Sequence, residues 1–172
     1  MEEEYQYKID RLLYNYASFL RNYAEIVASE NVSGEISIER ADFISLLAVL
    51  NNEIASYLEP LAGAANLFAK FLSTVNEVLT QSQEDMGDQG NWELMSEASV
   101  VKIVNEELPG SGETVRLRFK SFLVPTLNEI KAIRDEYIEG HEAGDMGLKY
   151  FKESIAAAKN LTDLLAFALK NE

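Results

Sequence analysis

The chain has 172 residues, which suits one domain able to bury roughly two-thirds of its unfolded surface. Its 47% hydrophobic and 26% charged residues are ordinary for a globular protein and too apolar for a disordered one. A formal net charge of -14 repels phosphates and anionic membranes, so nucleic-acid binding is not expected.

The first predicted helix covers residues 3–30, because apolar residues recur there in steps of four and three. Its stripe comprises Tyr5, Ile9, Leu12, Tyr16, Phe19, Tyr23 and Ile26, widened by Leu13, Leu20 and Val27. Tyr7 and Tyr14 fall about 160° from this stripe at 100° per residue, so both should be exposed. We therefore take Tyr7 and Tyr14 as candidates for binding a partner protein.

A second apolar stripe runs from residue 43 to residue 78 and keeps its helical phase across Pro60. It comprises Phe43, Leu47, Leu50, Ile54, Tyr57, Leu61, Ala64, Phe68, Phe71, Val75 and Val78. Proline either kinks or ends a helix, and the unbroken phase with small residues after Pro60 favours one kinked helix over a corner. That helix would reach roughly 69 Å, outrun its neighbours at about 40 Å and predict an oligomer, whereas a corner predicts a compact monomer.

Three more helices follow a loop expected at residues 85–91. A short helix over residues 92–108 should bury Leu94, Ala98, Val101, Val104 and Leu108. Residues 113–139 form the next, with a kink expected at Pro125, although residues 115–120 alternate like a strand. The last helix starts near Asp145 and uses Leu148, Phe151, Ile155, Ala158, Leu161, Leu165 and Leu169. We expect an all-α, single-domain bundle of five to six mostly antiparallel helices over residues 1–172.

The only histidine, His141, lies in the most densely titratable stretch of the chain. Arg134, the polar Asp135 and His141 resemble the arginine, polar residue and histidine motif of HEPN-domain proteins, which are helical bundles and often metal-independent ribonucleases. The resemblance implies that Arg134 holds a phosphate and His141 moves a proton, with two subunits meeting at the site. Against this, Gly140 can end the helix first, and the neighbouring acids repel an RNA substrate. A solvated helix end is the plainer interpretation.

Other chemistry has little support in the sequence. A ferritin-like di-metal site needs two Glu-x-x-His motifs, and the chain has a single histidine. The acids of residues 85–91 do not have the spacing of a calcium loop, and haem and phosphate-loop signatures are missing. We expect no metal and no cofactor. The basic cluster of Arg116, Arg118 and Lys120 is expected to pair with Glu106, Glu107 and Glu113, and the alternative is a patch that contacts phosphate.

The chain contains no cysteine, and its longest uncharged windows, residues 43–52 and 60–69, are far shorter than the ~18 residues of a membrane span. The acidic, aromatic start does not have the pattern of a secretory signal, so a cytoplasmic location is expected. These observations favour a non-enzymatic module that binds another protein or itself, with a homodimer plausible. The alternative is the ribonuclease that uses Arg134 and His141.

Overall fold

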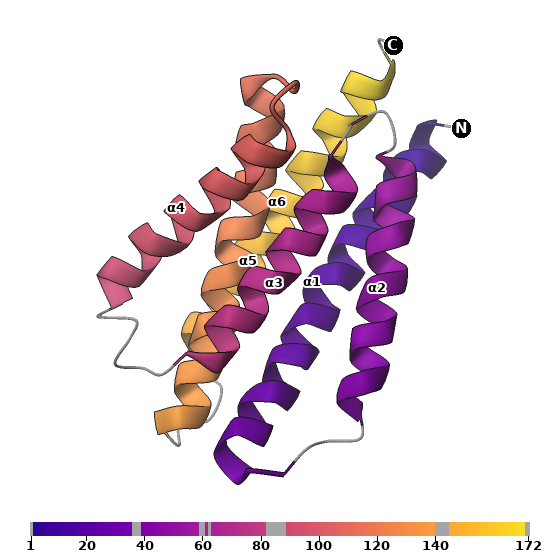
Figure 1. Ribbon diagram of the computed structural model, residues 1–172. Helices are drawn as coiled ribbons and strands as arrows, with labels where there is room; N and C mark the ends of the chain where they lie inside the picture. Colours follow the sequence, from indigo (N-terminus) through magenta and orange to yellow (C-terminus); the bar gives the residue numbers. More distant parts are fainter. Residues whose placement is uncertain are drawn as a thin grey trace.

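The computed structural model describes residues 2–35, 39–58, 61, 63–81, 89–139 and 145–170. Within these residues the chain forms an all-α bundle of six helices (Figure 1). The helices are α1 (Glu2–Ser33), α2 (Glu39–Tyr57), α3 (Ala64–Thr80), α4 (Gln89–Glu107), α5 (Glu113–Glu139) and α6 (Asp145–Lys170). The predicted fold class and number of helices are therefore confirmed.

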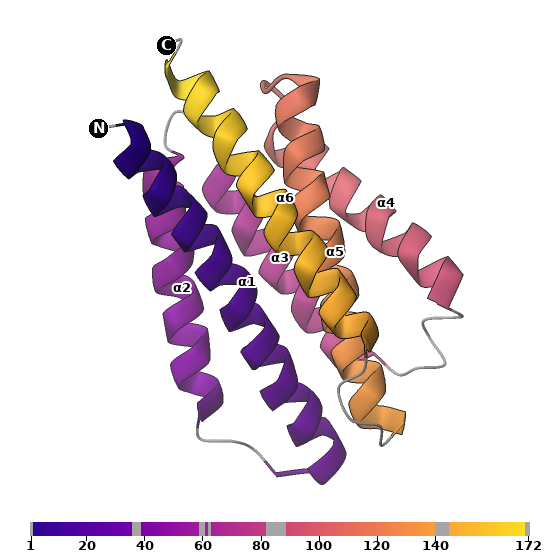
Figure 2. The same ribbon diagram turned by 180° about the vertical axis from the view of Figure 1, so that it is seen from behind.

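Successive helices alternate in direction, so the two chain ends lie at the same end of the bundle (Figures 1 and 2). Helix α5 is central, because it packs against α1, α3, α4 and α6. Helices α2 and α4 lie at opposite edges, and α2 packs against α1 and α3. No helix in the described part of the chain combines the length and apolar character needed to cross a bilayer.

The apolar stripes predicted for α1 and α3 form the centre of the core. Tyr16, on α1, packs edge-on against Phe68 of α3, with ring centroids 5.1 Å apart, and lies 6.5 Å from Phe122 of α5. Its neighbours in α1 are equally buried: Ile9, Leu13, Leu20, Tyr23 and Val27. The buried stripe of α1 is therefore centred on Leu13, Leu20 and Val27, which the sequence pattern placed at the edge of the stripe.

The predicted continuous helix across Pro60 is wrong, because α2 ends at Tyr57 and α3 runs back from Ala64. Pro60 itself lies outside the described residues. The turn shows an amide of Leu61 that donates to the Leu58 carbonyl at 2.7 Å and a Gly63 with φ of 97°. Most residues in both halves of the predicted stripe are nevertheless buried, now in two antiparallel helices. The expected oligomer, which rested on an overlong helix, loses this basis.

The predicted face of α4 is only partly correct: Val104 and Leu108 are buried as expected, but the first half of the helix buries other residues. Leu94 is 69% exposed, whereas Trp92, Ser96 and Val100 are buried. Ser96 occupies a buried position but is polar, so a search for apolar residues at helical spacing selects the exposed Leu94 in its place. In α6 the predicted Ala158, Leu161 and Leu165 are buried, whereas Leu148 is exposed and the polar Ser154 is buried.

Helix α5 continues through Pro125, and its strand-like start is helical as expected. A change of axis direction at Pro125 stays a prediction. The basic residues near this start find partners other than the expected ones: Lys120 pairs with Glu97 at 2.7 Å, and Arg116 donates to the Ser111 carbonyl. Helix α4 begins at Gln89, so residues 89–91, which were predicted to end the loop, belong to the helix.

Candidate functional site

The two tyrosines predicted to bind a partner are both exposed on α1. Tyr7 lines an open groove of about 660 Å³ between α1 and α2, together with Arg11 and Tyr57. Tyr14 faces α6, where its ring centroid lies 6.3 Å from that of Phe151. The groove near Tyr7 carries two acids and two bases, so its charge selects neither an anion nor a cation.

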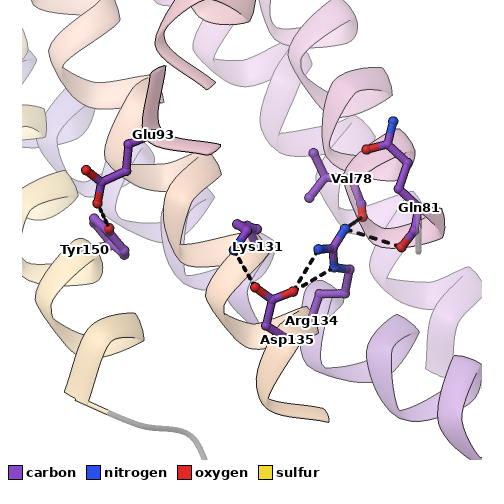
Figure 3. A network of polar contacts seen from close by, with 7 residues as sticks. All are labelled: Val78, Gln81, Glu93, Lys131, Arg134, Asp135 and Tyr150. Carbon is purple, nitrogen blue, oxygen red and sulfur yellow. Dashed lines mark hydrogen bonds and ion pairs between the residues drawn. The ribbon is translucent and has the colours of Figure 1, made fainter. Parts of the chain in front are cut away.

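Arg134 is 1% exposed and belongs to the core of the bundle. Its Nη1 donates to the Val78 carbonyl at 2.9 Å and to the Gln81 carbonyl at 3.3 Å (Figure 3). Its Nη2 and Nε donate to Asp135 Oδ1 at 2.7 and 3.2 Å. The guanidinium therefore caps the C-terminal end of α3, where unpaired carbonyls and the helix dipole favour a cation.

These contacts occupy the Arg134 donors that the ribonuclease hypothesis assigns to a phosphate. His141 lies outside the described residues, so the structure does not test whether the two side chains meet. Asp135, the polar residue of the motif, accepts from Arg134 and also pairs with Lys131 (Figure 3). Arg134 and Asp135 thus form part of the framework that joins α5 to α3.

Helix α5 contacts each of its four neighbours through one buried polar side chain. Thr126 and Ser154 of α6 share a hydrogen bond of 2.6 Å. Asn128 accepts from Ser96 of α4 at 2.6 Å. Arg134 reaches α3 as described, and Glu129 faces α1. Because a buried polar group is costly unless it is paired, these contacts favour one rotation of α5 relative to its neighbours.

Glu129 is the least satisfied of these groups. It is 1% exposed, and its Oε1 has no hydrogen-bond partner within the described residues. Arg21 Nε of α1 lies 3.5 Å from this oxygen and also 3.7 Å from Glu25 Oε1. Burial raises the pKa of Glu129 to about 8; Arg21 lowers it and Glu25 raises it by smaller amounts. Glu129 is therefore mostly protonated at neutral pH.

Replacing Glu129 by glutamine should remove a pH dependence of stability. Between about pH 4.5 and 8 the folded chain keeps the Glu129 proton that the unfolded chain releases, so wild-type stability falls as pH rises through this window. At pH 9 we expect Glu129→Gln to be the more stable protein by at least ~1.4 kcal/mol, the equivalent of one pKa unit. Urea titrations at pH 5, 7 and 9 measure the difference.

The exposed Glu77→Gln variant is the matched control, because it removes a carboxylate from the surface of α3. Its stability should follow that of the wild type at all three pH values. A Glu129→Gln difference that does not change with pH would contradict a raised pKa in the folded state.

Helix α2 exposes large apolar side chains on both flanks of its buried face: Leu46 and Val49 on one flank and Ile44 on the other. Ile44 is 44% exposed, Leu46 44% and Val49 56%, within a stretch, residues 43–52, that contains no charged residue. Leu47, Leu50 and Ile54 face the bundle and are buried. Helix α2 is thus apolar around most of its circumference, a pattern typical of helices covered on more than one side.

A second open groove, of about 550 Å³, lies between the other ends of α1 and α2. Its acidic lining consists of Glu25, Glu30, Glu35 and Glu39. Arg40 already pairs with Glu30 at 2.9 Å. Within the described residues there is no cluster of three or more His, Cys, Asp or Glu side chains that could hold a metal ion.

Neither a protein-family model, nor a curated protein, nor a solved structure matches this chain. Its function is therefore inferred from the residues themselves. Sequence reasoning missed two features. Glu129 occupies a position of the apolar period Phe122, Thr126, Glu129, Ile133, which is a detectable signal of a buried acid. The uncharged residues 43–52 of α2 are too few for a membrane span, but they contain more large apolar side chains than one buried face can hold. This excess is a signal that some of them are exposed.

Proposed function

We propose that this chain is a non-enzymatic, acidic helical module that acts by binding another protein through the exposed apolar surface of α2. One observation carries the proposal: Leu46 and Val49, three positions apart on one side of α2, are large apolar side chains that remain exposed although the buried face of this edge helix is already filled. Exposed apolar side chains gathered on one element are typical of protein-interaction sites. The surrounding framework supports a rigid helix for docking, since α2 packs on α1 and α3.

The ribonuclease alternative receives less support from the geometry. It requires the Arg134 guanidinium at a surface, whereas this group is buried and bonded to α3 and Asp135. The surface charge of the chain also opposes an RNA substrate. Cleavage of RNA by the wild type that is lost in a folded His141→Ala variant would restore this alternative.

Site-specific crosslinking tests the binding proposal. A photoreactive phenylalanine derivative in place of Val49 should form an adduct with a defined protein in the native host, whereas the same group in place of the exposed Leu94 of α4 should not. The captured protein is then purified and titrated against the chain. We expect Leu46→Glu/Val49→Glu to weaken binding by at least about tenfold, the equivalent of 1.4 kcal/mol.

Leu94→Glu serves as the control, because it places a charge on an exposed leucine at another edge of the bundle. The double variant should keep the wild-type melting temperature, since both side chains are exposed in the bundle. Equal adducts from positions 49 and 94, or a double variant that binds as tightly as the wild type, would overturn the proposal.

A further inference from the structure

Four exposed residues form a stripe along one side of α2, centred about 100° from the middle of its buried face. They are Asp42, Leu46, Val49 and Glu53, separated by steps of four, three and four, which we call the outer stripe. At 100° per residue they fall within about 60° of one another. The order along the helix is therefore acid, apolar, apolar, acid.

Both carboxylates of the outer stripe are available to a partner. Among the residues that the structure describes, no Lys or Arg forms a salt bridge with Asp42 or Glu53. Arg40, the base of α2, is held by Glu30 at 2.9 Å. Glu53 also lines the groove that contains Lys8 and Arg11; Lys8 pairs with Glu4 at 2.8 Å, and in the described part of the chain neither base forms a salt bridge with Glu53. Each acid lies about one turn beyond an apolar residue, so it can meet a charge on a helix packed over Leu46 and Val49.

We infer that the outer stripe binds an amphipathic helix of a partner protein that carries a Lys or Arg one turn beyond each end of an apolar pair. This partner rests on the proposed function and is defined by its apolar pair and its two flanking bases. The apolar pair removes the exposed surface of Leu46 and Val49 from water, and the two bases meet Asp42 and Glu53. The net charge of -14 adds a long-range attraction that accelerates encounter with a basic segment.

A second copy of the chain fits this stripe poorly. Two α2 helices packed antiparallel about the point midway between Leu46 and Val49 would place Leu46 of one copy against Val49 of the other. The same register would place Asp42 against Glu53 at both ends of the contact, and like charges across a helix pair destabilise it. Two chains of charge -14 also repel each other at a distance.

Two synthetic helical peptides of equal length test the inference. The basic peptide carries Lys, Leu, Leu and Lys at the spacing of the outer stripe, and the acidic peptide carries Glu in place of both Lys residues. Fluorescence anisotropy with the whole chain should show about tenfold tighter binding of the basic peptide, because two surface ion pairs replace two repulsions. The preference should shrink in 1 M salt, where the Debye length is about 3 Å.

Charge exchange on the protein separates local pairing from net charge. Asp42→Lys/Glu53→Lys should reverse the preference and select the acidic peptide. Glu153→Lys/Asp163→Lys, which alters two exposed acids of α6 by the same total charge, should leave the basic peptide preferred. A preference that follows the net charge in both double variants would overturn the inference.

The outcomes also separate this inference from the function on which it rests. Equal binding of both peptides at low salt, or failure of both while Val49 still crosslinks to a partner, overturns the basic helix and leaves the binding module intact. A wild-type dimer that Leu46→Glu dissociates has the same consequence and identifies the partner as a second copy. Absence of any specific adduct at Val49 overturns the proposed function itself.

Discussion

Replacing Arg134 by methionine should destabilise the bundle by about 3–5 kcal/mol, the usual effect of removing one partner from a buried charged pair. The variant leaves the carbonyls of Val78 and Gln81 at the end of α3 without their donor and leaves Asp135 with Lys131 as its remaining basic partner. Urea denaturation followed by circular dichroism measures the change. Arg134→Lys should also be destabilised, because an ammonium cannot reproduce the planar fork of donors.

The exposed Arg11 provides a matched control for this substitution. Arg11→Met removes the same charge from α1 and should change the free energy of unfolding by less than ~0.5 kcal/mol. If Arg134→Met and Arg11→Met unfold at the same urea concentration, Arg134 does not hold α3 to α5 in the way its contacts indicate.

Gly63→Ala should disrupt the corner between α2 and α3 by two separate effects. Gly63 has a φ of 97°, which costs a residue with a side chain about 1–3 kcal/mol. A Cβ at this position would also lie 1.9 Å from the Glu107 carbonyl oxygen, so the start of α3 and the end of α4 must move apart. Overpacking of this kind adds about 1–3 kcal/mol. Thermal unfolding should show a lower melting temperature.

Two other glycines separate these effects. Gly34 has a φ of 73°, and no atom lies within 4 Å of the position that a Cβ would take, so Gly34→Ala reports the backbone strain by itself. Gly110 has open space and no positive φ, so Gly110→Ala should be close to neutral. We expect destabilisation to rise from Gly110→Ala to Gly34→Ala to Gly63→Ala, and equal effects at positions 34 and 63 would show that the contact with Glu107 is relieved at no cost.

Local periodicity was sufficient to predict most of the fold. The stripes of α1 and α3 and the helical start of α5 follow from spacing and from the lack of a partner strand. The corner could not be predicted this way, because the stripe keeps its phase across Pro60 whether the chain continues or reverses. The feature that distinguishes a corner from a continuous helix is the close approach of Gly63 to Glu107, a contact between residues far apart in sequence.

Parts of the buried faces of α4 and α6 could not be predicted from hydrophobicity. Ser96 and Ser154 are buried, but a hydrophobicity pattern assigns polar serines to the exposed side of a helix. Their burial depends on Asn128 and Thr126 of α5. The place of Arg134 was equally inaccessible to sequence reasoning, because its bonds reach carbonyls of α3 more than fifty positions earlier. Motif spacing indicated a surface phosphate ligand, and tertiary packing gave the same residue a helix end to cap.

The central position of α5 has a consequence for synthesis of the chain. Helices α1, α3 and α4 all pack on α5, yet all of them leave the ribosome before it. The contacts of Tyr16 with Phe122 and of Phe68 with Phe119 therefore cannot form until residues 113–139 emerge, and until then the apolar surface that α5 covers is exposed to water or to non-native contacts. A ribosome stalled after α4 would hold a chain that lacks α5. We expect chaperone binding to the nascent chain to be strongest at this stage of synthesis.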